Sequence, residues 1–457
     1  MENLTKAEFI SYFSPEILTT IGIIINLLLF MFFSSKTNCK KISDILTSTV
    51  LLINSIILLF FLNGSFKYGF CISNNNLFMD WENIGIKFFA NLFALAFVLI
   101  TYKLTRRAKY RVPVLNASLL LILLAIDIFS LSVNILLPFI MLDVVSFLLY
   151  KHTSFLKHRN KSIFDLNFIL INIIASLLFY GFYIAKLFVN DTLMIILLDV
   201  FVSFAILFKT GIFPLFNYQK FKNFRLNLPY SILLGIILPF CGVIAFCKIS
   251  KFLTLSSEIY LMSMVVFLVF SMISFAIFAY RTKNLVTLAT NFTYFICSFC
   301  VVLTIFQIDF NLTFKILSLN MLIMLSFYSL ISIAKQNLKS NKITFLQING
   351  TYLNNPFYAF ILSLTILFSC GIIPSGITKT TLIALKELYL YDKNALILIA
   401  ICTICMILIT INLLKLIQNL YTFKKELLLN QMKKFTKKTT LNYVASLVII
   451  LILIICL

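Results

Sequence analysis

Hydrophobic runs recur about every 25 to 35 residues along the whole of this chain. A helix needs roughly 20 apolar residues to cross a hydrocarbon core of about 30 Å, and the runs approach this length. Only helices and closed barrels satisfy all backbone hydrogen bonds inside a bilayer. The pattern, in 457 residues of which 61% are hydrophobic, predicts an all-α, polytopic membrane protein. We expect about fourteen spans, at residues 16–34, 43–63, 84–102, 113–129, 131–150, 163–185, 193–214, 228–247, 258–280, 286–306, 312–334, 356–385, 394–420 and 441–457.

The loops between these runs alternate in charge. The loops that follow the odd-numbered spans hold 26 of the 38 lysine and arginine residues, whereas the opposite side, including the N-terminus, holds seven. Basic residues gather on the cytoplasmic side of membrane proteins, so we expect both termini on the other side. This distribution accounts for the net charge of +22 without a nucleic-acid partner. The lipid bilayer is the expected surrounding.

Two pairs of cysteines have the spacing of a metal or redox motif. One pair is Cys297 and Cys300, and the other is Cys402 and Cys405. Both pairs fall inside apolar runs, where thiols behave as small hydrophobic groups. We therefore expect neither a metal nor a cofactor on this chain.

The seventh run contains a lysine at the point where the helix is about to break. Residues 193–208 are almost entirely apolar, Lys209 follows them, and Gly211 and Pro214 interrupt the helix directly afterwards. A charge at membrane depth beside irregular backbone indicates a functional site. The other interpretation is a lysine near a helix end whose amine extends to the interface.

The fifth run contains a carboxylate. Seven residues separate Asp143 from the basic residue Lys151, which corresponds to about 10 Å of helix. A short side chain at that depth does not easily reach water, so it is paired, lies in a wet cavity, or is neutral and hydrogen-bonded.

The twelfth run repeats the combination of a break and a lysine. Gly371, Pro374 and Gly376 interrupt it, and Lys379 follows. Matched interruptions in two parts of a transporter indicate structural repeats and lie along the ion path. In the preceding run, Lys315 either extends to the interface or lines a polar path.

Five segments, taken in order, resemble the antiporter-like membrane subunits of respiratory complex I. The resemblance covers roughly residues 80 to 420 and depends on the order and spacing of the segments. They are NILLPFIMLDVVSFLLY, SIFDLNFILINIIASLLFYG, LFKTGIFPLFNY, KNLVTLATNF and CGIIPSGITK. In this family a glutamate stands at the position of Asp143, and lysines stand at those of Lys209 and Lys379.

The resemblance implies two five-helix inverted repeats, each with one broken helix. It assigns helices 1–3 to residues 1–112, the first repeat (helices 4–8) to residues 113–247 and the second repeat (helices 9–13) to residues 256–420. A basic loop and helix 14 occupy residues 421–457.

The resemblance also implies a function, which is proton translocation coupled to quinone reduction in a bacterial inner membrane. Asp143, Lys209 and Lys379 would be the proton relay. The chain would be a subunit of the NADH–quinone oxidoreductase without a redox centre of its own. Quinone, FMN and iron–sulfur clusters would belong to partner subunits of the complex, and other membrane-arm subunits would be its partners. Further relay candidates are Tyr230, Ser231, Thr290, Asn291, Thr293 and Lys315.

The sequence departs from the family at several relay positions. Pro239 falls on the lysine of helix eight, and Thr293 stands where a histidine is common. Phe216 and Tyr218 replace a histidine and a tryptophan after helix seven. Two alternatives therefore remain: a subunit of a multi-subunit sodium–proton antiporter or membrane-bound hydrogenase, and a structural subunit that no longer conducts protons.

Overall fold

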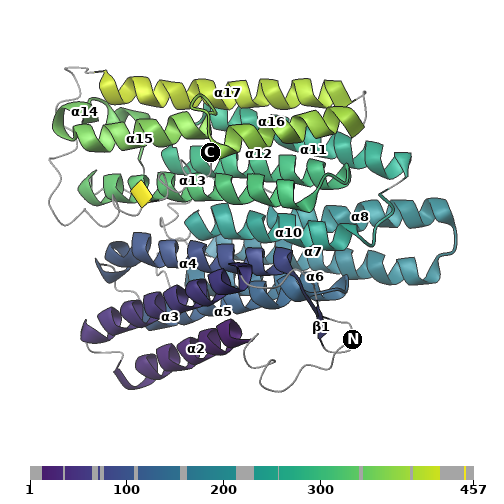
Figure 1. The fold of residues 1–457 in the computed structure, drawn as a ribbon, viewed down its shortest axis with the longest axis horizontal. Helices are drawn as coiled ribbons and strands as arrows, with labels where there is room; N and C mark the ends of the chain where they lie inside the picture. Colours follow the sequence, from purple (N-terminus) through teal and green to yellow (C-terminus); the bar gives the residue numbers. More distant parts are fainter. Residues whose placement is uncertain are drawn as a thin grey trace. The chain divides into compact units, whose positions relative to one another are not determined.

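The structure is a computed structural model, and almost all of its regular elements are helices (Figure 1). Within the described part of the chain, eleven helices are long and apolar enough to cross a membrane. The prediction of a polytopic, all-α membrane protein is therefore confirmed. The described residues are 13–33, 37–63, 70–72, 77–107, 112–154, 162–212, 231–255, 257–338, 343–391, 395–422 and 447–448.

The chain divides into two compact units, Met1–Ile169 and Leu170–Leu457. Each unit has its own helix packing and is described by itself. The division into N-terminal helices, two repeats and a C-terminal helix remains a prediction.

The first unit is built around helix α5, of whose span 78% is buried. Helices α2, α3, α4 and α6 all pack against it. Such burial suits a helix that is apolar on every side. A short antiparallel hairpin, in which Phe70 pairs with Met79, lies in the segment between α3 and α4. The elements are α2 (Ser14–Phe33), α3 (Thr37–Asn63), β1 (Phe70–Ile72), β2 (Leu77–Met79), α4 (Trp81–Arg107), α5 (Val112–Leu131) and α6 (Leu136–Ser154).

Helix α12 is the centre of the second unit, with 94% of its span buried. It packs against α10, α11 and α13, while α17 covers α11 and α15 (Figure 1). The elements are α7 (Ser162–Phe188, which begins in the first unit), α8 (Thr192–Thr210), the π-helix η2 (Leu233–Ile237), α10 (Leu238–Ser250), α11 (Glu258–Arg281), α12 (Leu285–Ile305), α13 (Phe310–Leu338), the 3₁₀-helix η3 (Phe345–Ile348), α14 (Thr351–Asn354), α15 (Pro356–Ser369), α16 (Gly376–Tyr391) and α17 (Leu396–Tyr421).

The buried helix formed by η2 and α10 contains a proline, and its backbone adapts locally. Pro239 has no N–H to donate, and in a regular α-helix its ring would clash with the carbonyl group four residues earlier. The turn directly before it is a π-helix, in which the Leu238 N–H bonds to the Leu233 carbonyl oxygen. A wider turn of this kind relieves such a clash within a continuous helix.

Two glycines allow this same helix to approach its neighbours closely. A Cβ atom added at Gly235 would lie 2.4 Å from Thr290 Cγ2, and one added at Gly242 would lie 2.5 Å from Thr210 Cγ2. Real Cβ atoms do not tolerate such distances, so only glycine fits at either position. Small residues at helix crossings are a main source of packing energy in membranes. Gly242 therefore fixes α10 against the end of α8, directly beside Lys209.

We predict that Gly242→Ala weakens this crossing. Overpacking of a buried contact costs about 1–3 kcal/mol, so the detergent-solubilised protein should unfold at a lower temperature. Gly181→Ala is the matched control, because a Cβ there has no atom within 4 Å. Alanine favours a helix over glycine by up to about 1 kcal/mol, so this control should be neutral or stabilising. Equal effects of the two substitutions would contradict the close-approach interpretation.

Candidate functional site

Helix α8 brings Lys209 into the interior of the second unit. Asp191 caps the helix start by accepting a hydrogen bond from Leu193 N (3.2 Å), and Gly211 ends it with φ = 75°. Lys209 is fully buried, and its Nζ donates to Ser176 Oγ on α7 at 2.8 Å. Its ammonium group also lies near the negative end of the helix dipole, which favours a cation. The amine therefore points into the protein and does not extend to the surface.

The proposed partner of Lys209 lies on the other unit. Asp143 is half-buried on α6, one turn before Ser146, which donates to the Asp143 carbonyl oxygen at 2.9 Å. The pairing of Asp143 with Lys209 would join the two units and remains a prediction.

A second charged residue of α8 has its own set of partners. Asp199 is fully buried and accepts from Lys186 Nζ of α7 at 2.5 Å. Thr254 donates to its other oxygen from both its backbone N and its Oγ1, each at 3.0 Å. This carboxylate therefore ties α7, α8 and the segment before α11 together. Lys186 lies just outside the span predicted at residues 163–185, and this ion pair was not predicted from the sequence.

The polar contacts continue from α8 to α11. Ser203 Oγ donates to the Asp199 carbonyl oxygen at 2.8 Å and lies 2.7 Å from the hydroxyl group of Tyr260. Both side chains are buried. The face of α8 toward α11 thus makes a polar contact through Ser203.

Helix α12 holds several of the relay candidates in its first half. Thr290, Asn291 and Thr293 are buried, as is Ser231 before η2. Thr290 and Thr293 donate to carbonyl oxygens of their own helix at 2.9 Å. These hydrogen bonds offset the free-energy cost of burying their hydroxyl groups in an apolar surrounding. Tyr230, Pro214, Phe216 and Tyr218 lie outside the described residues.

The second helix break separates α15 from α16. Gly371 has φ = 70°, and Thr378 Oγ1 accepts from Ser375 N at 2.8 Å at the start of α16. Gly376 is buried, Pro374 is exposed, and so is Lys379 on the first turn of α16. Lys315, on the second turn of α13, is also exposed.

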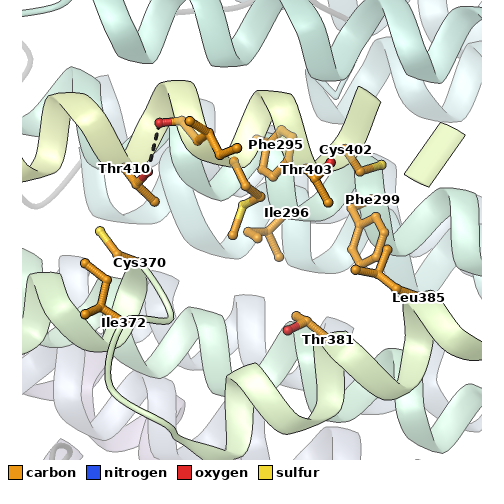
Figure 2. Close-up of a pocket in the computed structure, with 12 residues that line it drawn as sticks. Phe295, Ile296, Phe299, Cys370, Ile372, Thr381, Leu385, Cys402, Thr403 and Thr410 are labelled. Carbon is orange, nitrogen blue, oxygen red and sulfur yellow. Dashed lines mark hydrogen bonds between the residues drawn. The ribbon is translucent and has the colours of Figure 1, made fainter. Parts of the chain in front are cut away.

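A mostly apolar cavity of about 340 Å³ lies beside this break (Figure 2). Cys370 and Ile372 of the break, Phe295 and Phe299 of α12, and residues of α16 and α17 line it. Figure 2 shows that Thr381 lies on the side of α16, opposite α17. The cavity leaves space beside the interrupted backbone, where a side chain can move without overpacking the core.

A more polar cavity of about 490 Å³ lies at the ends of α10, α12 and α13. Ser250, Lys251, Thr304, Gln307 and Thr313 line it. Over the part of the chain with described side chains, no group of three or more His, Cys, Asp or Glu residues could hold a metal ion. The polar groups that line this cavity include hydroxyl and amide groups and one ammonium group.

The first unit contains a buried ion pair that the sequence analysis missed. Lys87 of α4 donates to Glu16 of α2, and Lys87 is fully buried. The signal was present, because Lys87 lies inside the apolar run 84–102. It was hidden because Glu16 is 71 residues away in the sequence.

Together, the buried charges and the two interrupted helices define a polytopic membrane protein with ionisable groups inside its helix bundles. No family model matches the sequence, and no curated protein matches it. The fold is similar to that of a chain in the solved structure "Respiratory complex I from Thermus thermophilus with bound Aureothin". The TM-score is 0.75, the sequence identity is 12%, and the match covers 96% of this chain and 97% of that chain.

We predict that Asp199 contributes more to stability than the exposed Asp191 of the same helix. Asp199→Ala leaves Lys186 and Thr254 without their acceptor, and loss of one partner of a buried ion pair costs about 3–5 kcal/mol. Water around the partly exposed Lys186 reduces this cost. Asp191→Ala removes only a helix cap, worth about 1 kcal/mol. Thermal unfolding of the two purified variants should show the larger loss for Asp199→Ala, and the reverse order would contradict the tethering role.

Proposed function

We propose that this chain is a proton-translocating membrane subunit of a complex I-type NADH–quinone oxidoreductase, most similar to its subunit N. The observation that carries the proposal is the likeness in fold, which extends over nearly the full length of both chains. The lysine at position 379 favours subunit N over subunit M, because subunit M resembles proteins that have a glutamate at this position. The broken helices and the buried Lys209 are the features that a charge-transfer path requires.

In this mechanism Asp143 and Lys209 form an ion pair that opens and closes. Paired with the carboxylate, Lys209 keeps its proton. Separated from it, a buried ammonium group is disfavoured by several kcal/mol, and the proton leaves. Moving one charge against ~180 mV costs roughly 4 kcal/mol, at ~2.3 kcal/mol per 100 mV. Loss of the carboxylate partner therefore disfavours the charged amine by enough to release one proton against this potential.

The path onward from Lys209 uses hydroxyl and amide groups. Ser176 contacts the amine of Lys209, and Thr290, Asn291 and Thr293 are buried on α12. Hydrated side chains of this kind relay protons without becoming charged. Lys379, at the second helix break, is the outer station. The two repeats would occupy residues 113–247 and 256–420.

The energy for the cycle comes from partner subunits. Quinone, FMN and iron–sulfur clusters belong to those partners, and this chain contributes the proton path. We place both termini on the periplasmic side of a bacterial inner membrane, because the basic loops then face the cytoplasm.

The first test is proton pumping by the assembled complex in sealed vesicles. Lys209→Ala and Asp143→Asn should each abolish the share of pumping that passes through this subunit, while quinone reduction continues. Lys283→Ala is the control, because Lys283 is an exposed lysine before α12. Full pumping by an assembled Lys209→Ala complex would remove the relay role.

The second test concerns Lys379. Lys379→Ala should reduce pumping in the same assay, whereas Lys379→Arg should preserve part of it, because the cation remains but releases its proton less readily. Unchanged pumping in Lys379→Ala would restrict this residue to a role in packing or topology.

One observation favours a structural subunit as the second candidate. Pro239, where the family has a lysine, is buried in a helix that is 94% buried. With a structural subunit, the complex would still pump normally when Lys209 is replaced by alanine, but it would fail to assemble when the helix crossings of the subunit are disrupted. The Gly242→Ala variant tests assembly and the Lys209→Ala variant tests conduction.

A further inference from the structure

Three ionisable side chains from three helices lie inside the first unit. Two of these helices, α2 and α4, lie outside the two proposed repeats, and the third, α5, belongs to the first repeat. Glu16 lies in the first turn of α2, Lys87 on α4 and Asp127 on α5. Lys87 and Asp127 are 0% exposed and Glu16 is 8% exposed. Lys87 and Glu16 form an ion pair, and both lie near enough to Asp127 to interact with it electrostatically.

This cluster has more hydrogen-bond acceptors than donors. Among the described residues, neither carboxylate oxygen of Asp127 has a hydrogen-bond partner, and nor does Oε2 of Glu16. Asn54 and Asn91 lie on the neighbouring helices α3 and α4, but their amide nitrogens donate to backbone carbonyl groups. Their side-chain oxygens also lack a donor within the described part of the chain. An ionised Asp127 would therefore be a buried charge without a single hydrogen bond.

Asp199 shows what an ionised aspartate needs at the same degree of burial. It is also 0% exposed, yet it accepts three hydrogen bonds, one of them from an ammonium group. A buried charge without such partners costs so much that the group becomes neutral instead. For a carboxylate, neutral means protonated. The ion pair of Glu16 with Lys87 is already neutral, so one proton on Asp127 balances the whole cluster.

An apolar layer separates this cluster from the nearer helix ends. Ile84 precedes Lys87 by one turn, and Leu131 follows Asp127 by one turn. Both pack with Leu58 in a fully buried group, which Phe13, Phe61, Leu62 and Phe88 surround. The cluster therefore lies in a dry part of the bundle. A proton, which moves between adjacent polar groups, has easier access to such a place than a hydrated ion.

We propose that Asp127 is a further proton-binding site, which holds its proton next to the Glu16–Lys87 ion pair. The site is independent of the Asp143–Lys209–Lys379 relay, and neither proposal requires the other. Binding forms one O–H bond on the carboxyl group, and release breaks it. On the other helices packed against α5, Asp44 of α3 accepts from Asn116 at 3.0 Å, and Asp143 of α6 belongs to the relay.

The test uses the full-length chain in its native membrane with dicyclohexylcarbodiimide, an apolar reagent that reacts with protonated carboxyl groups. Peptide mass spectrometry should find the label on Asp127 and not on the equally buried Asp199. Lys87→Met should add label at Glu16, because Glu16 then loses its counter-charge and takes up a proton as well. Label on Asp199 but not on Asp127 would overturn the proposal.

Infrared spectroscopy gives a second measurement that does not depend on access of the reagent. The wild-type protein should show the C=O band of a buried carboxylic acid, and D127N should lose that band while D199N keeps it. If the wild-type protein has no band that D127N removes, the proposal is overturned even if Asp127 is labelled. Sodium chloride, but not potassium chloride, protecting Asp127 from the reagent would also overturn it, because the site would then hold a sodium ion.

Discussion

A polar group inside a bilayer has only protein partners, and this constraint organises the molecule. The amine of Lys209 bonds to Ser176, the carboxylate of Asp199 accepts three hydrogen bonds, and the hydroxyl groups of α12 donate to their own helix. Each contact fixes one helix against another or allows a polar side chain to be buried. Where a partner is lacking, as at Asp127, the group must change its charge state. The need of each buried polar group for a protein partner thus determines both how the helices are held together and which groups are charged.

Close packing and irregular backbone occur together around Lys209. Gly242 lets α10 touch Thr210, and Gly211 ends α8 immediately afterwards. The π-turn before Pro239 keeps the same buried helix continuous despite its proline. The lysine is therefore held by a rigid neighbour on the side of α10. The second break, at Gly371, instead borders a cavity of about 340 Å³, which leaves room for movement.

The two buried aspartates show how context selects chemistry in the membrane. Asp199 has a cation and two further donors, so its charge is compensated and its role is to hold helices together. Asp127 lies beside an ion pair that is already complete, so an additional negative charge has no compensation. The same side chain at the same burial thus serves as a tether in one unit and as a proton-binding group in the other.

The sequence by itself determined the class of protein, a polytopic all-α membrane protein, because hydrophobicity over about 20 residues is a local property. It also pointed to Lys209 and Gly211, since a charge and a glycine in an apolar run are visible in one segment. It could not reveal that Lys186 pairs with Asp199, or Glu16 with Lys87, 71 residues apart. Such pairs depend on how each helix is rotated about its axis. Only the packing of whole helices, through contacts such as Gly242 with Thr210, decides that rotation.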